Sequence, residues 1–374
     1  MVPARERRRY IDWARGLAVL VMIEAHTFDA WTRLASRAGH NYRNLTVLGG
    51  FAAPLFLWLA GVALVLSAER TLARTGSRRE AATAICRRGL EIFILAFLFR
   101  LQAFIVSPGS ALVMVFRVDI LNIMGPGIVL AGLVWGLAEG AWAAAIAFSV
   151  LTSALVMVTP IVRGAQWVNA LPRLIQWYVR PEADYTNFTM FPWVAFLLAG
   201  AAVGALIAAA RDSRREGRLQ LMLGGVGALF VAVGFYTATL PSIYHPRSLF
   251  WYTSPTFFAI RLGVMMLALT LLYGLQAGIG PWAQALMKLT KLTKLMAPVE
   301  RIGRSSLFIY WIHVELVYGY ATWPLRHHLT VWQVAAAYAL FCAAMYGALV
   351  LRDRAVAAWR LRRISGGTAE PLIA

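Results

Sequence analysis

Five polar or charged side chains lie in and just before the first long apolar stretch of the chain, which covers residues 13–34. They are Asp12, Arg15, Glu24, His26 and Asp29. Charged groups are costly inside a bilayer, so each of them indicates a function if this stretch crosses a membrane. A histidine can take up and release a proton near neutral pH, and carboxylates and arginines can orient it or pair with each other. The stripe therefore predicts a site for acid–base or group-transfer chemistry.

Helical geometry places most of these side chains on one face. At about 100° per residue, Arg15 and His26 lie about 20° apart around the helix axis and about 16 Å apart along it. By the same geometry, Asp12 falls within about 60° of Arg15. Asp29 follows His26 by three residues, so it can reach the imidazole and fix its tautomer. The predicted face therefore extends from one membrane interface into the opposite half of the bilayer.

A purely structural network is the alternative for this face. Asp12 and Arg15 would then cap the helix, and His26 would pack between helices. Against this alternative stands the position of the three residues on a helix that could have been wholly apolar. The stripe favours a functional site.

Other polar residues in apolar stretches have less specific explanations. Glu24 lies nearly opposite the His26 face and needs a partner elsewhere, for which Arg100 and Arg117 are candidates. His313 and Glu315 lie two residues apart in a later stretch. They face opposite sides of a helix, so structural hydrogen bonding accounts for them. We expect these residues to stabilise the helix bundle.

The composition indicates a protein that is embedded in a membrane. Hydrophobic residues make up 60% of the 374-residue chain and charged residues only 14%, whereas soluble domains have about 25% charged residues. The apolar residues form blocks of about twenty, the length that a helix needs to cross a bilayer. We predict an all-α, polytopic transmembrane bundle that forms a single domain, 1–374, with basic tails at 1–12 and 352–374. About ten spans are expected, at 13–34, 46–68, 89–107, 116–137, 140–160, 188–210, 219–240, 255–276, 304–323 and 331–351.

The distribution of charge predicts the orientation in the membrane. The net charge is +19, and 24 of the 36 Lys and Arg residues fall in alternate connecting segments and both tails. These segments are 1–12, 69–90, 210–218, 277–304 and 352–374. An excess of Lys and Arg marks cytoplasmic loops, so both termini are expected in the cytoplasm. The membrane topology therefore accounts for the position of the basic residues, and we do not expect them to bind nucleic acid. The Ala-, Arg- and Gly-rich composition indicates the inner (plasma) membrane of a bacterium.

The segment Arg9–Met22 has the sequence RYIDWARGLAVLVM. A basic residue, an Asp and an Arg-Gly pair precede an apolar run that ends in Met. This pattern resembles the opening signature of membrane acyltransferases related to heparan-α-glucosaminide N-acetyltransferase. Four residues further on, His26 occupies the position at which that family has Asn or His. His26 also resembles the histidine of the first helix in the wider acyltransferase type 3 family.

A second histidine matches the family by its spacing. His40 precedes Pro54 by fourteen residues, which resembles the distance from the reactive histidine of the family to a proline in its second span. The chain departs from the family at Ala53, where an aromatic residue is expected. Later blocks also resemble the family, namely Arg87–Leu90, Val118–Leu121, Phe191–Trp193 with Gly200, and Ile302–Tyr310 with His313.

The resemblance implies transfer of an acyl group, usually acetyl, from cytosolic acyl-CoA to a sugar or glycan on the other side of the membrane. The implied catalytic residues are His40 as acyl acceptor or base, His26 as its polar partner, and Asp29 orienting His26. Which histidine performs the chemistry stays open at this stage. Because CoA carries phosphates, arginines near the inner face are candidates to bind it. These are Arg15, Arg87, Arg88 and Arg304.

The partners expected on this basis are acyl-CoA, a carbohydrate acceptor and the lipid bilayer, with acetyl-CoA as co-substrate and no metal. Assembly as a homodimer is left open. A transporter or flippase of a polar or lipid-linked solute is the alternative, since spans with internal charges and breaks also suit transport. No inverted repeat is visible in the sequence, and the reactive residues gather on one helix and the loop after it. A non-catalytic scaffold would leave the face of Asp12, Arg15 and His26 without a purpose.

Overall fold

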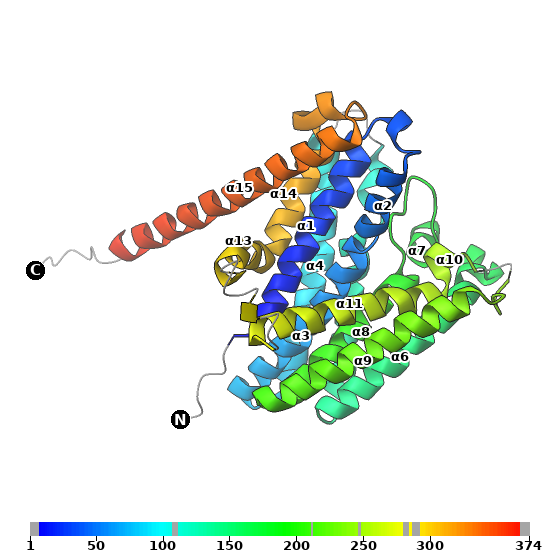
Figure 1. The fold of residues 1–374 in the computed structure, drawn as a ribbon, viewed down its shortest axis with the longest axis vertical. Coiled ribbons are helices and arrows are strands. Elements are labelled where there is room, and N and C mark those ends of the chain that lie inside the picture. The colour runs from blue at the N-terminus through cyan, green and yellow to red at the C-terminus, as the bar shows by residue number, and fades with distance from the viewer. Residues whose placement is uncertain are drawn as a thin grey trace, which may run out of the picture. The chain divides into compact units, whose positions relative to one another are not determined.

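Helices joined by short loops make up nearly the whole chain (Figure 1). A computed structural model describes residues 7–106, 111–210, 212–245, 248–279, 284–285 and 292–366. Within these ranges there is no β-strand, only two isolated bridges, Thr32 with Leu329 and Val118 with Thr186. The predicted all-α architecture is confirmed. The helices are α1 (Arg9–Trp31), α2 (His40–Gly49), α3 (Ala52–Thr75), α4 (Arg78–Val106), α5 (Ile120–Leu137), α6 (Ala141–Arg163), α7 (Arg173–Val179), α8 (Met190–Ala209), α9 (Ser213–Ala238), α10 (Phe250–Thr253), α11 (Pro255–Ala277), α13 (Leu292–Arg304), α14 (Ser306–Tyr318) and α15 (Val331–Gly366).

Eight helical segments of the described chain are long and apolar enough to cross a membrane. One of them comprises α2 and α3 together, and the others are α4, α5, α6, α8, α9, α11 and α15. The two remaining predicted spans correspond to α1, which carries the charged stripe, and α14, which has only 13 residues. At 1.5 Å per residue α14 is about 20 Å long, less than the thickness of a hydrocarbon core. The protein is therefore a polytopic membrane protein, and the side on which its ends lie remains a prediction.

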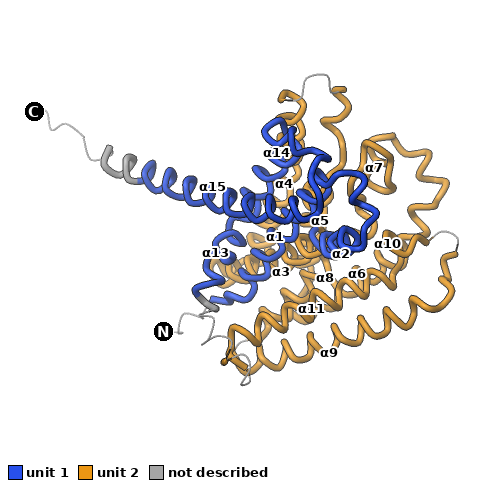
Figure 2. The backbone as a smooth tube through the Cα atoms, turned by 45° about the horizontal axis from the view of Figure 1, so that its top comes forward, with its two compact units in different colours: residues 1–52, 288–374 blue, residues 53–287 orange. Residues whose placement is uncertain are grey.

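The chain divides into two compact units (Figure 2). Unit 1 combines both ends of the sequence, residues 1–52 and 288–374, and unit 2 comprises residues 53–287. In unit 1, α1 packs against α2, α13, α14 and α15. In unit 2 the closest pairs are α4 with α5, α9 with α11, and α6 with α8. The charged stripe of α1 thus meets helices that lie almost 300 residues away in the sequence.

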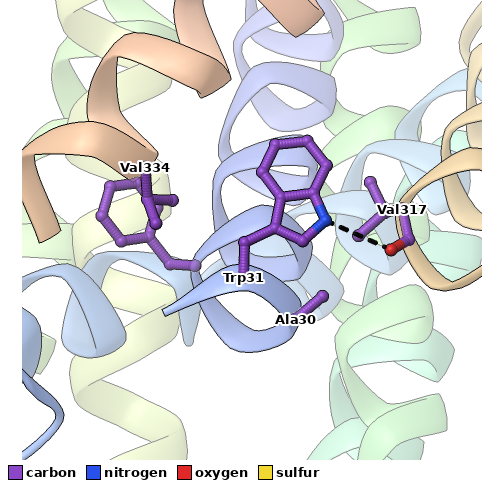
Figure 3. Packing of buried hydrophobic residues seen from close by; sticks show 5 residues of the cluster. Ala30, Trp31, Val317 and Val334 are labelled. Carbon is purple, nitrogen blue, oxygen red and sulfur yellow. Dashed lines mark hydrogen bonds between the residues drawn. The ribbon is translucent and has the colours of Figure 1, made fainter. Parts of the chain in front are cut away.

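A hydrophobic cluster holds the end of α1 in place within unit 1. Trp31 is buried beside Val317 of α14 and Val334 of α15, together with Phe28 and Ala30 of α1 (Figure 3). The indole Nε1 of Trp31 donates a hydrogen bond of 3.3 Å to the carbonyl oxygen of Val317. Trp31 is only 1% exposed, so its ring fills the junction by van der Waals packing between the helices. The cluster therefore fixes the part of α1 that carries His26 against α14.

Candidate functional site

The site in unit 1 is built on a close crossing of α1 and α13. A methyl group on Gly16 would overlap the backbone carbonyl of Val299, and one on Gly303 would overlap the backbone of Asp12 and Gly16. The two helices therefore touch through their backbones, which only glycine permits at these positions. As a consequence, the polar side chains beside the two glycines converge.

Asp12 is the centre of the resulting charge cluster. Asp12 is 8% exposed, and its carboxylate accepts a 2.8 Å hydrogen bond from Nε of Arg7. Guanidinium nitrogens of Arg15 and Arg304 each lie 3.9 Å from its oxygens. The hydrogen bond to Asp12 raises the pKa of the Arg7 guanidinium further above its usual value. Three arginines therefore share one nearly buried carboxylate.

A second carboxylate extends the cluster along α13. Glu300 is 5% exposed and accepts a 3.2 Å hydrogen bond from Nε of Arg9, and it also pairs with Arg304. Arg15 donates a 3.2 Å hydrogen bond to the hydroxyl of Ser306 at the start of α14. Beside these groups lies an open cavity of about 430 Å³. Its lining residues are Arg9, Ala297, Glu300, Arg301, Arg304, Ser305 and Asp353.

Two histidines meet further along α1. Nδ1 of His26 lies 2.8 Å from Nε2 of His313 on α14, and Nδ1 of His313 lies 2.8 Å from the carbonyl oxygen of Ile309. His313 is completely buried, whereas His26 is partly exposed. The ring of Tyr318 contacts His26 edge-on, with 5.7 Å between ring centroids. The predicted face of α1 thus has a polar partner on α14 as well as on α13.

Asp29 does not orient His26 in the way that the sequence predicted. Its carboxylate accepts a 3.0 Å hydrogen bond from the hydroxyl of Tyr318 and lies 3.9 Å from Arg37. Arg37 also donates to the backbone carbonyl of Asp29. The ring of His26 is restrained instead by the hydrogen bond between its Nδ1 and Nε2 of His313. Asp29 was predicted as the partner because it follows His26 by one helical turn. The partner of Nδ1 of His26 is instead His313, which is far away in the sequence.

The other predicted site residues are exposed or have other partners. His40 is exposed at the first position of α2, and the interactions among the described residues include none with its side chain. Arg87 and Arg88 belong to unit 2, where both pair with Glu91 of the same helix at 3.3 and 3.1 Å. Of the four arginines predicted to bind CoA, Arg15 and Arg304 share the cluster around Asp12.

The predicted partners of Glu24 are engaged elsewhere. Arg100 pairs with Asp119, and Arg117 donates a 2.6 Å hydrogen bond to the side chain of Asn187. Glu24 is 5% exposed, and neither of its carboxyl oxygens has a hydrogen-bond partner among the described residues. The prediction for Glu24 was wrong because Arg100 serves the capping carboxylate of α5.

The contact of His313 with His26 and the positions of Glu300 and Tyr318 in the site were not predicted from the sequence, and Ser306 was noted only as part of the Ile302–Tyr310 block. A signal for His313 was present, since it is a histidine in an apolar segment just as His26 is. The sequence predicted only structural hydrogen bonding for it and named no partner, whereas in the structure its Nε2 pairs with His26 of α1. Glu300 lies two residues before the Ile302–Tyr310 block and Ser306 lies within it. Only the packing of α13 and α14 against α1 brings them to Arg9 and Arg15.

The fold and the site define a polytopic membrane protein with an arginine-rich cavity and a pair of hydrogen-bonded histidines between its helices. The sequence matches the family model of the catalytic region of heparan-alpha-glucosaminide N-acetyltransferase over residues 7–237. This match covers more than half of the chain, so the chain belongs to that family and falls in the class of membrane acetyltransferases. A comparison with curated proteins gave no match. The matched region contains the whole of α1 and His40, while Arg304 and His313 lie beyond it.

Proposed function

We propose that this protein transfers an acetyl group from cytosolic acetyl-CoA to a sugar or glycan on the other side of the membrane. The observation that carries the proposal is the arrangement of α1, on which the arginine cluster around Asp12 and the histidine pair at His26 lie on one face. Fourteen residues separate Asp12 from His26, which corresponds to about 21 Å along a helix. Acetyl-CoA with its phosphates bound near Asp12 needs to reach across this distance to bring its thioester to His26.

The cavity at the α1–α13 crossing suits the nucleotide end of CoA. Its walls include Arg9, Arg301 and Arg304. Arg15 is linked to this group because it shares the carboxylate of Asp12 with Arg304. Guanidinium groups bind phosphate through paired, charge-assisted hydrogen bonds. Glu300 and Asp353 hold the arginines of the wall in place through ion pairs. Arg87 and Arg88 belong to unit 2, and a role for them in binding the donor stays a prediction from the sequence.

The histidines supply the chemistry of the transfer. The acceptor hydroxyl or amine attacks the thioester carbonyl, and its proton passes to an unprotonated ring nitrogen. A bond from carbonyl carbon to the acceptor forms, the carbon–sulfur bond breaks, and the CoA thiolate leaves and recovers the proton. His40 can instead carry the acetyl group on its imidazole between the two half-reactions. A bilayer location fits this scheme because it separates a cytosolic donor from an outer acceptor.

The orientation follows from the positive-inside rule. The basic segments, including the arginines before α1, are placed in the cytoplasm, so the cavity beside Arg9 opens to the compartment that contains acetyl-CoA. The same rule places His26 in the outer half of the bilayer. For a bacterial chain this membrane is the inner membrane.

The proposal is tested by incubating the purified protein with acetyl-CoA that carries a radiolabelled acetyl group. We expect release of free CoA and labelling of the protein or of an added amino sugar, and loss of both in His26→Ala and in His40→Ala. His328→Ala is the matched control, because His328 is an exposed histidine of the same unit. Wild-type rates in both histidine variants would contradict the assignment of the site. If acetyl-CoA does not bind while a polar solute crosses proteoliposome membranes, the protein is a transporter.

A further inference from the structure

His26 and His313 form an end-to-end pair of imidazole rings. The bonded nitrogens are 2.8 Å apart, the ring centroids are 5.0 Å apart, and the planes differ by 10°. The centroid separation exceeds the nitrogen separation by about the sum of the two ring radii. Two nearly parallel rings with this separation share one plane and point their nitrogens at each other. The contact is therefore an in-plane hydrogen bond and not a face-to-face stack.

The backbone of α14 determines which nitrogens carry the protons. The carbonyl oxygen of Ile309 can only accept, so Nδ1 of His313 must be the donor in their 2.8 Å contact. A neutral His313 then has a lone pair on Nε2, and this atom must accept from Nδ1 of His26. Neutral His26 therefore has its proton on Nδ1. Its Nε2 is the unprotonated nitrogen.

We propose that His313 is a positioning residue that holds His26 in the Nδ1–H tautomer, so that Nε2 of His26 accepts the proton in the transfer reaction. This inference rests on the proposed function for the reaction, but the tautomer follows from the hydrogen bonds alone. When Nε2 takes the proton of the acceptor, His26 becomes an imidazolium and Nδ1 still donates to His313. The same proton then passes from Nε2 to the CoA thiolate, which leaves His26 in its starting state.

The packing around His313 suits a rigid orienting group. His313 has no exposed surface, and both of its nitrogens are engaged, so the buried ring leaves no polar atom unsatisfied. The hydrogen bond from Trp31 to Val317 and the cluster around it fix α14 against α1. His26 itself is partly exposed, as a group that meets a substrate needs to be. A rigid, buried ring behind an accessible ring is the arrangement expected of an orienting residue and its base.

Nitrogen NMR of the full-length protein, labelled with ¹⁵N-histidine, tests the tautomer without reference to activity. The chain has six histidines, and the signals of His26 are those that vanish in His26→Gln. At about pH 8, where a histidine of ordinary pKa is neutral, we expect a protonated Nδ1 and a bare Nε2 for His26. In His313→Leu, which removes the acceptor but retains the bulk, we expect this pattern to change to a mixture or to the other tautomer.

Kinetics distinguish positioning from a structural role. His313→Leu should lower kcat on the order of a hundredfold and leave the KM for acetyl-CoA unchanged. His313→Gln should recover most of the lost kcat, because an amide oxygen can accept from Nδ1 of His26. Val317→Ala is the control for loosening of α14, since it removes buried side-chain volume next to the histidines and keeps every backbone group. It should retain the wild-type tautomer.

The outcomes separate the two proposals. A proton on Nε2 of His26 in the wild-type protein, or an unchanged tautomer in His313→Leu, overturns the role of His313 whether or not acetyl groups are transferred. If Nε2 of His26 is unprotonated but the protein never consumes acetyl-CoA, the proposed function is overturned. The assignment of this nitrogen as the base in acyl transfer then falls with it. A parallel loss of kcat in His313→Leu and His313→Gln, with folded protein in both, also contradicts the role of His313 as an acceptor.

Discussion

Gly16 of α1 and Gly303 of α13 lie in backbone contact, and this contact brings the Arg15-Gly16 and Gly303-Arg304 pairs together. Arg15 precedes Gly16 and Arg304 follows Gly303, so both guanidinium groups reach Asp12. Neither glycine provides backbone flexibility in this structure, because both lie inside regular helices. Their role is to let the helices approach closely enough for the arginines to share one carboxylate.

The first prediction concerns this contact. Gly16→Ala should lower the free energy of unfolding by about 2 kcal/mol, because the added methyl group overlaps a backbone carbonyl that cannot rotate away. Thermal unfolding in detergent measures the loss, and binding of acetyl-CoA should weaken in the same variant. Gly347→Ala is the matched control, since a methyl group on this glycine of α15 meets open space. Equal stability of the two variants would contradict the close crossing.

The second prediction concerns the arginines beside the cavity. Arg304→Gln should raise the KM for acetyl-CoA about tenfold, which corresponds to about 1.4 kcal/mol of binding free energy, with kcat nearly unchanged. Added salt should raise the KM of the wild-type enzyme more than that of the variant, because one charge–phosphate interaction is missing. Initial rates at several salt concentrations measure both effects. Arg214→Gln, an exposed arginine at the start of α9, should behave as wild type, and a similar rise in its KM would argue against a specific contact.

The third prediction ranks the polar neighbours of His26. Asp29 accepts a hydrogen bond from Tyr318 and lies close to Arg37. The hydrogen bond at Nδ1 of His26 is made with His313, so neither Asp29→Asn nor Tyr318→Phe removes it. Both variants should therefore lose much less kcat than His313→Leu. Steady-state kinetics of the three variants under the same conditions establish the order. A larger loss in Asp29→Asn than in His313→Leu would restore Asp29 as the orienting group.

Local periodicity was enough to predict the helices and one face of the site. The stripe of Asp12, Arg15 and His26 could be placed on one side of α1 because helical geometry depends only on spacing along the sequence. The partners of that face could not be derived in the same way. Glu300 and His313 lie almost 300 residues further along, and their positions depend on how α13 and α14 pack against α1.

The two errors of the sequence argument have a common physical cause. Asp29 was assigned to His26, and Glu24 to Arg100 or Arg117, because charge and helical spacing alone suggested these pairs. In the structure, Asp29 pairs with Tyr318, and Arg100 pairs with Asp119. Competition among several polar groups for one partner is decided by tertiary packing. The positions of such groups can be predicted from the sequence, whereas the pairs they form cannot.

The last prediction concerns Glu24, which is 5% exposed and has no hydrogen-bond partner for either carboxyl oxygen among the described residues. A buried polar group without partners is destabilising, and an apolar group of similar size avoids this cost. Glu24→Leu should therefore raise the free energy of unfolding by about 1 kcal/mol, seen as a higher midpoint of thermal unfolding in detergent. Glu24→Asp keeps the buried acid and should show no gain. If Glu24→Leu instead unfolds more easily, or folds well but loses acetyl transfer, the carboxyl group must have a partner or a task in the reaction.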